Sequence, residues 1–317
     1  MLYDEEIPIL KTDSKESEFE EMKNRFSHYD PTYVFNGLVK ERRVYIEKAF
    51  SLSEKFLDID FKAQIKIEGN FFSRLWELQL CTILISNDYK LVEPPRVKKA
   101  LARPDFCIEQ EDGSKIWIEA VCPQLGPLAP KPEIVPGQIY TRDSKIFDEL
   151  QSSAPRIISS TLAKYKKLDS YKKNPDFLST DKFILALNTE MINHREPADM
   201  AKELVLYGMG LMYIKQTGES GRHFHNEILG NIRGREVRVP TALFHRKEYE
   251  HISAVISSNC WFDFGDGFIK TMSDRINTYF NQNAINKLDP EFINFGTKHT
   301  MLCEGDYCKL EHHTNSE

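Results

Sequence analysis

The sequence lacks any apolar run close to the roughly 20 residues that a membrane-spanning helix needs. Its first residues, 1–6, also lack the basic and apolar regions of a secretory signal. Cys81, Cys107, Cys122 and Cys260 lie in apolar contexts, as buried free thiols do. We therefore expect a cytoplasmic protein that does not bind a membrane, although a substrate of a signal-independent secretion system would look the same.

Several functional motifs are also missing. We find no Gly-rich phosphate loop, no nucleophile elbow and no dinucleotide fingerprint, which argues against kinases, serine-type hydrolases and dehydrogenases. The chain has no excess of positive charge either, since 42 Lys and Arg stand against 48 Asp and Glu, for a net charge of −6. A surface that binds nucleic acid must therefore be local.

What the sequence does contain is a strong hairpin signal at residues 103–123. Residues 106–108 and 116–121 are β-branched, aromatic or otherwise apolar, and Asp112-Gly113 lies between them. Asp105 begins the first strand, and Glu119 interrupts the apolar second strand. A carboxylate inside a strand is costly unless it is paired, hydrogen-bonded or bound to a metal. A shared cation is the simplest joint explanation for the two acids.

A third acid, Glu77, lies in the nearly all-apolar helix that residues 68–86 predict. Its neighbours one and two turns on, Leu80, Cys81 and Leu84, keep it from facing bulk water alone. Two explanations stay open. Glu77 forms a structural ion pair with Arg74 or Arg103, or it reaches the site of Asp105 and Glu119.

The succession of Pro104-Asp105, a hairpin and Glu119 resembles the PD-(D/E)xK, or restriction-endonuclease-like, nuclease superfamily, in a bacterial branch that lacks the motif lysine. The likeness covers roughly residues 69 to 188. It implies an α/β fold with a central mixed β-sheet flanked by helices. It also implies that Asp105, Glu119 and the carbonyl of Ala120 bind Mg²⁺ or Mn²⁺, helped by Glu77.

The lysine of this superfamily stands two residues after the glutamate, where this chain has Val121. Lys115 lies four residues from Glu119, about 13 Å along the strand, which is too far. Because superfamily members relocate this lysine, Arg156 and Lys164 on the following helix are the candidates. Gln124, just past the strand, is a candidate to position water.

Acids without histidines between them favour Mg²⁺ or Mn²⁺ over zinc. A second set at the C-terminus, Cys303, Cys308, His312 and His313, has roughly the spacing of zinc ligands. The polar residues around it also suit a disordered tail, so its role stays open. His223 and His225 read as a pair in a loop rather than as ligands.

The order of elements predicts one elaborated α/β domain with no internal repeat. We expect an N-terminal lead-in and helical cap at 1–67, a nuclease-like domain at 68–300 and a tail at 301–317. The expected elements of the middle domain are a strand at 89–92, the hairpin, a helix with Pro155 in its first turn, strands at 182–188, 252–257 and 292–295, and a helix at 200–213. A Pro-rich connection at 123–137 should border the site.

These observations predict a divalent-metal-dependent nuclease that hydrolyses phosphodiester bonds, with DNA a better candidate than RNA. Its groove would use basic residues at 96–103 and 222–238 with Arg156, Lys164 and Lys167. Two alternatives stay open, namely a non-catalytic module that binds nucleic acid or protein, and a metal-dependent enzyme with a small substrate. The oligomeric state also stays open, with a homodimer among the options.

Overall fold

The computed structural model describes residues 39–95, 101–123, 146–192, 195–214, 219–232, 235–259, 273–304 and 307–314. The chain divides into two compact units. Unit 1 comprises residues 1–100, 130–142 and 262–272, and unit 2 comprises 101–129, 143–261 and 273–317. The described part of unit 1 is thus residues 39–95, and it includes the helix that carries Glu77.

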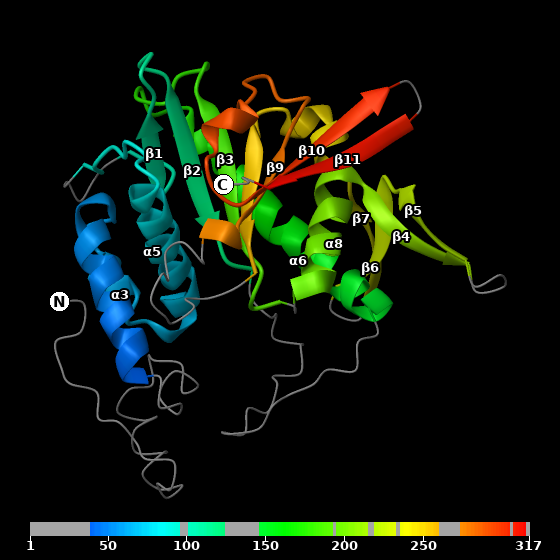
Figure 1. Ribbon diagram of the computed structural model, residues 1–317, viewed down its shortest axis with the longest axis horizontal. Coiled ribbons are helices and arrows are strands. Elements are labelled where there is room, and N and C mark those ends of the chain that lie inside the picture. Colours follow the sequence, from blue (N-terminus) through cyan, green and yellow to red (C-terminus); the bar gives the residue numbers. More distant parts are fainter. Residues whose placement is uncertain are drawn as a thin grey trace, which may run out of the picture. The chain divides into compact units, whose positions relative to one another are not determined.

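Unit 1 is helical in its described part. Its elements are α3 (Val39–Ser53), η1 (Glu54–Phe56), α4 (Phe61–Gln64), η2 (Glu68–Asn70) and α5 (Phe71–Ser86). Figure 1 labels α3 and α5. Helix α5 is buried continuously from Leu75 to Leu84, as its apolar sequence predicts. Phe50 of α3 stacks on Phe61 of α4 at 6.0 Å. The strand expected at 89–92 does not form, since Leu91 makes only an isolated bridge.

Unit 2 is built on a seven-stranded mixed sheet, coloured from teal (β1) to red (β11) in Figure 1. The strands are β1 (Phe106–Glu109), β2 (Lys115–Val121), β3 (Lys182–Asn188), β8 (Ala254–Ser258), β9 (Asn277–Phe280), β10 (Thr297–Glu304) and β11 (Tyr307–Thr314). Neighbours follow that order, and the pairs β2–β3, β3–β8 and β9–β10 are parallel. The expected central mixed sheet in an α/β chain is confirmed.

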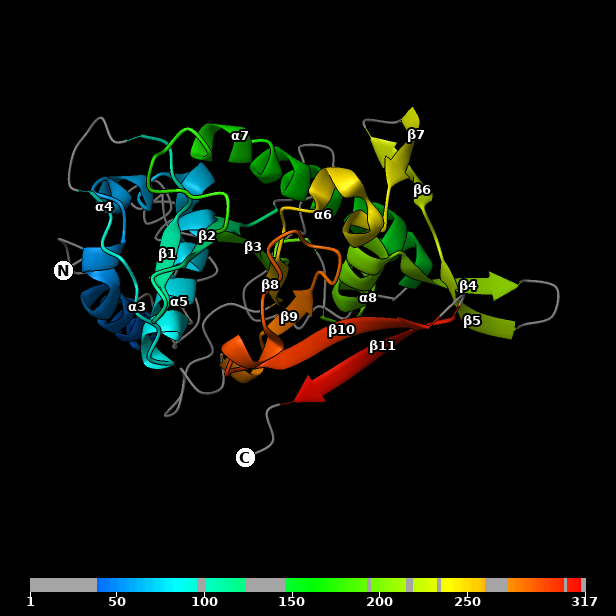
Figure 2. The same ribbon diagram turned by 90° about the horizontal axis from the view of Figure 1, so that it is seen from above.

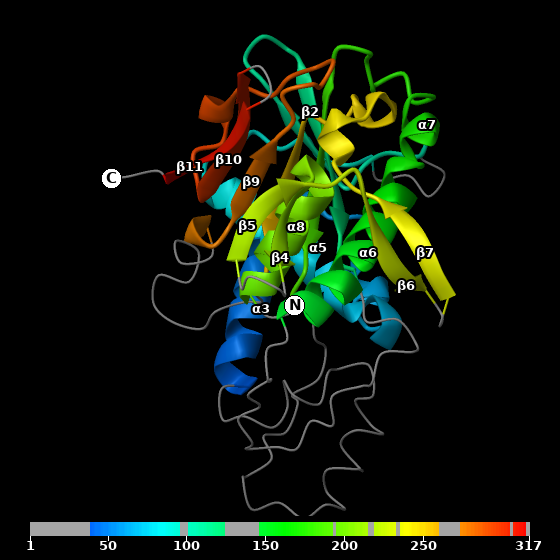
Figure 3. The same cartoon turned by 90° about the vertical axis from the view of Figure 1, so that its right-hand side faces the viewer.

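Three helices of unit 2 lie along this sheet: α6 (Ile146–Tyr165), α7 (Leu168–Tyr171) and α8 (Arg195–Tyr207). Helices α6 and α7 connect β2 to β3, which is parallel to it, as the strand–helix–strand pattern predicts. Helices α6 and α8 pack side by side (Figure 3). Pro155 was expected in the first helical turn, but α6 begins at Ile146 and Pro155 lies in its interior. That prediction was wrong because α6 begins nine residues before Pro155.

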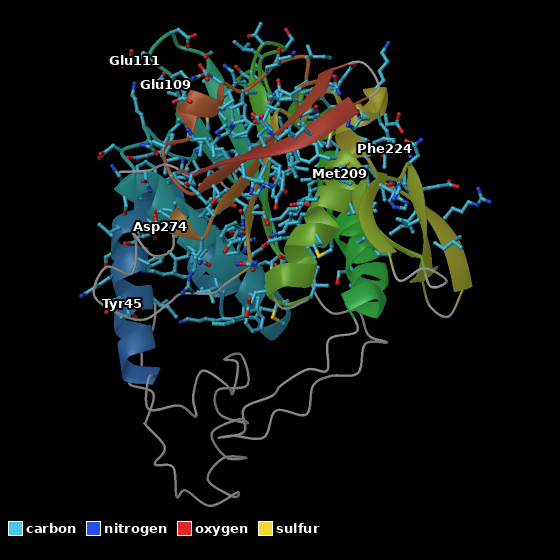
Figure 4. The ribbon with its side chains drawn as sticks, turned by 45° about the vertical axis from the view of Figure 1, so that its right-hand side comes forward. Tyr45, Glu109, Glu111, Met209, Phe224 and Asp274 are labelled. Atoms are coloured by element: carbon cyan, nitrogen blue, oxygen red, sulfur yellow. The ribbon has the colours of Figure 1, made fainter. Side chains whose placement is uncertain are left out.

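Two small antiparallel sheets interrupt the chain between β3 and β8. They pair β4 (Met209–Ile214) with β5 (Glu219–Phe224), and β6 (Glu227–Ile232) with β7 (Arg235–Pro240), as Figure 2 shows. Met209 lies opposite Phe224 at one end of the first pair (Figure 4). The helix expected at 200–213 ends at Tyr207, because Gly208 turns the backbone with φ +76° and a strand follows.

The C-terminal part differs from expectation in two places. The strand expected at 292–295 does not form, since Pro290–Phe292 is a 3₁₀ helix (η5) whose Glu291 N–H is capped by the Asp289 carboxylate. Residues 301–304 and 307–314, expected in a tail, instead belong to the β10–β11 hairpin. The connection at 124–137, the loop at 96–100 and Cys260 lie outside the described residues. Among the described helices, none has the length and apolar character needed to cross a membrane.

Candidate functional site

The site begins with the β1–β2 hairpin, which forms as the sequence predicts. Phe106 pairs with Ile118, and Glu109 pairs with Lys115. Gly113 takes the left-handed conformation that the turn needs, with φ +79°. In this register Asp105, one residue before Phe106, comes opposite Glu119. The two acids are therefore carried to the same face of the hairpin.

Glu119 is 1% exposed, and three donors surround its carboxylate. Lys164 donates to Oε1 at 2.7 Å and Lys167 donates to the same oxygen at 3.2 Å. The Tyr171 hydroxyl donates to Oε2 at 2.8 Å. These groups come from the end of α6, the link after it and α7. The buried charge of Glu119 is thus compensated by hydrogen bonds and by two ammonium groups.

Tyr171 has a raised pKa. Burial raises the pKa of its hydroxyl, and the Glu119 charge, the hydrogen bond to Glu119 and the Asp105 charge raise that pKa further. The phenol therefore stays protonated and keeps donating to Glu119 throughout the physiological range.

Asp105 is held by the backbone of the neighbouring strand. Its Oδ2 accepts the Ala120 N–H at 2.7 Å. This bond fixes the Asp105 carboxylate beside the residue that follows Glu119. The structure thus brings together three residues that the sequence singled out for the site, Asp105, Glu119 and Lys164, and it places Ala120 beside them.

Other predicted residues have different partners. Glu77 is in unit 1, where Arg74 binds its Oε2 at 2.6 Å, which is one of the ion pairs that the sequence left open. Arg156 lies on α6 two turns before Lys164, and it is not among the described contacts of Glu119. Val121 is buried, as an apolar residue in a central strand should be. Gln124 lies outside the described residues.

The basic residues expected to line one groove are divided. Lys164 and Lys167 meet at Glu119, whereas Arg238 belongs to the separate β6–β7 sheet and pairs with Glu227 at 2.6 Å. Arg103 lies over the Trp117 ring, 5.8 Å from its centre. Lys164 and Lys167, from α6 and the link to α7, are thus the described basic residues that form ion pairs with Glu119.

Sequence reasoning missed Tyr171 as a site residue and gave Lys167 no role at Glu119. Their spacing carries a signal, because Lys164, Lys167 and Tyr171 stand at i, i+3 and i+7, which is one face of a helix. A cavity of about 270 Å³ adjoins the same short helix. Leu168 of α7 and Lys172, which directly follows that helix, line the cavity together with Asp181 and His251.

Among the described residues, a group of side chains with the spacing of metal ligands lies away from the β1–β2 hairpin. The one group of three that lies close enough to hold an ion is Glu203, His299 and His312, and none of the hairpin acids belongs to it. No known family model, curated protein or solved structure matches the chain.

Proposed function

We propose that this protein is a divalent-metal-dependent nuclease with a restriction-endonuclease-like core, in which Lys164 takes the part of the missing motif lysine. The observation that carries the proposal is the 2.7 Å contact between Lys164 Nζ and Glu119 Oε1. The resemblance predicts a relocated lysine on the helix after the hairpin, and Lys164 lies there, at the predicted glutamate.

The arrangement of the surrounding elements supports the proposal. An antiparallel hairpin carries Asp105 and Glu119, a helix follows, and the next strand is parallel to the second hairpin strand. This succession supports the proposal from the hairpin onwards, whereas the strand expected ahead of it at 89–92 does not form. The role of Glu77 stays a prediction from the resemblance.

The donor atoms suit a hard divalent ion. Asp105 and Glu119 offer carboxylate oxygens and Ala120 a carbonyl oxygen, the ligands that Mg²⁺ and Mn²⁺ prefer. When bound, such an ion would polarise a phosphoryl oxygen and lower the pKa of a water molecule.

The protein's own groups have separate tasks in this proposal. Lys164 is 25% exposed, so its ammonium group can stabilise the negative charge that develops on a phosphodiester near Glu119. Tyr171 holds the Glu119 carboxylate in place from the opposite oxygen. Lys167, half-exposed, offers a further positive charge to the nucleic-acid backbone.

The test is cleavage of double- and single-stranded DNA and of RNA with Mn²⁺ or Mg²⁺ present. Glu119→Gln and Lys164→Met should each lower the rate by about 100-fold or more, the usual loss when a group that stabilises developing charge is removed. Lys166→Met is the matched control, because Lys166 is exposed on the same chain segment and does not contact Glu119. Its rate should stay within about twofold of wild type.

A cleavage rate that is unchanged in Glu119→Gln would mean that the acids do not carry the activity. A wild type that binds nucleic acid without metal and does not cleave it would favour the non-catalytic module. One observation supports that second function, namely that Lys164, Lys167 and Tyr171 already satisfy the Glu119 carboxylate.

A further inference from the structure

Three side chains meet near the edge of the sheet that lies furthest from β1 and β2 in strand order. Glu203 comes from α8, His299 from β10 and His312 from β11. One ligand atom of each lies within 4.8 Å of the others. The sheet itself sets this group, because His299 and His312 are direct partners in the antiparallel register.

His299 is held in one orientation. Its Nε2 lies 2.8 Å from the Asn277 side-chain oxygen, which can only accept a hydrogen bond. Nε2 therefore carries the proton, and Nδ1 presents a lone pair. The ring also stacks on Tyr279 with centroids 4.4 Å apart and an angle of 15°. A fixed tautomer and a fixed ring are what a metal-binding histidine needs.

His312 faces that lone pair from the next strand. The two Nδ1 atoms are 2.7 Å apart, so a single proton lies between them. Tetrahedral zinc with bonds of about 2.0–2.1 Å separates its ligands by roughly 3.3 Å. A zinc ion in place of the proton would require the two Nδ1 atoms to lie roughly half an ångström further apart. His312 is exposed, so its ring can move by that distance.

Glu203 lies on helix α8, which is hydrogen-bonded to strands β9 and β10 through Tyr207. Tyr207, one turn after Glu203, places its hydroxyl 2.8 Å from the His299 carbonyl oxygen and 3.0 Å from that of Phe280. Glu203 is buried, and a buried carboxylate favours a nearby cation. The adjacent Lys202, also buried, forms an ion pair with Asp199 at 2.6 Å.

We propose that Glu203, His299 and His312 bind a divalent transition-metal ion, zinc in the first instance, and leave a fourth position to water. Two imidazoles and one carboxylate are a donor set that zinc accepts in sites with an open position. The set differs from the oxygen ligands of Asp105 and Glu119, so this site is independent of the proposed nuclease activity.

The site also differs from the zinc-like spacing of the C-terminal sequence. Cys303 and Cys308 lie opposite each other in the β10–β11 register. Each is four residues along its strand from the histidine of that strand, His299 or His312. That offset is about 13 Å, too far for the cysteines to share the ion. His313 is next to His312 in the strand, so its side chain belongs to the opposite face of the sheet.

The test uses the full chain without a histidine tag. Zn²⁺ binding is measured by calorimetry, and the visible spectrum of bound Co²⁺ reports the ligand set. Wild type should bind one ion, and the spectrum should lack thiolate bands. His312→Ala should weaken binding at least tenfold, and Glu203→Gln should do the same. His313→Ala should bind as wild type does, and so should a variant with both Cys303 and Cys308 changed to Ser.

His299→Ala is the weaker variant, because the ring is buried and its loss endangers folding; His312 is exposed, which keeps the test decisive. The proposal is overturned if wild type binds no Zn²⁺ at micromolar concentration. It is also overturned if His312→Ala binds normally, or if the cysteine variant loses the ion. None of these outcomes depends on nucleic-acid cleavage, so failure of either proposal is visible without the other.

Discussion

The Glu119 carboxylate is accommodated within an apolar strand because each of its oxygens accepts a hydrogen bond. Burial of a carboxylate without such partners would cost several kcal/mol. The acid is recognisable in the sequence, since a glutamate between Ile118 and Ala120 breaks an apolar run. Its partner Tyr171 is not recognisable, because 52 residues separate the two and the contact depends on how α7 packs.

Tyr171→Phe should therefore destabilise the protein by about 1–3 kcal/mol, the usual effect of removing one hydrogen bond from a buried charged group. Urea unfolding followed by circular dichroism measures the change. Tyr165→Phe is the matched control, because that hydroxyl bonds the exposed carbonyl of Glu248 at 2.7 Å. The control should lose less than half as much. Equal losses would show that the hydrogen bond to the buried Glu119 carboxylate contributes no more than a hydrogen bond to an exposed carbonyl oxygen.

At the scale of elements, the spacing of apolar residues predicted the helices and strands whose formation depends mainly on neighbouring residues. The helix at Phe71–Ser86, the hairpin and the strand at Lys182–Asn188 form where apolar periodicity places them. Strand β4 was missed because Leu211-Met212-Tyr213 continues an apolar helical pattern beyond Gly208. The group of Glu203, His299 and His312 was missed because the two histidines meet through strand register and Glu203 joins them from helix α8.

Gly296, just before β10, offers an element-scale prediction. Its φ is +69°, and an added Cβ would clash with the Ile276 carbonyl oxygen. That oxygen accepts the Thr297 N–H at 2.8 Å, where β10 begins beside β9. Gly296→Ala should cost about 2–5 kcal/mol, from backbone strain and overpacking together.

Gly113→Ala is the comparison, because its φ is also positive but nothing lies within 4 Å of the added Cβ. It should cost only about 1–2 kcal/mol, from backbone strain alone. Thermal unfolding of both variants measures the difference. A similar loss of stability in the two variants would show that the clash with the Ile276 carbonyl oxygen does not contribute.

At the scale of the whole molecule, each of the two units contains at least one buried thiol, whose reactivity measures whether that unit opens. Cys81 lies in unit 1, and Cys107 and Cys122 lie in unit 2. Burial raises the pKa of each to about 12, so almost no thiolate forms at pH 8. The sequence predicted that these three cysteines are buried, and this is confirmed.

Iodoacetamide at pH 8 should therefore leave Cys81, Cys107 and Cys122 unmodified in the native protein and modify all three in urea. Peptide mass spectrometry reads each site separately. Rapid native labelling of Cys81 but not of the other two would mean that unit 1 opens locally while unit 2 stays folded. Rapid labelling of all three would contradict the burial described here.

The strands of the large sheet have the same order in space as along the chain, from β1 to β11. During synthesis the chain leaves the ribosome from its N-terminus, so each new strand can add to the edge that the previous strand has just formed. No strand has to insert between two that are already paired. The β10–β11 hairpin comes after the other strands of this sheet along the chain, so the group of Glu203, His299 and His312 is completed only after those strands have been made.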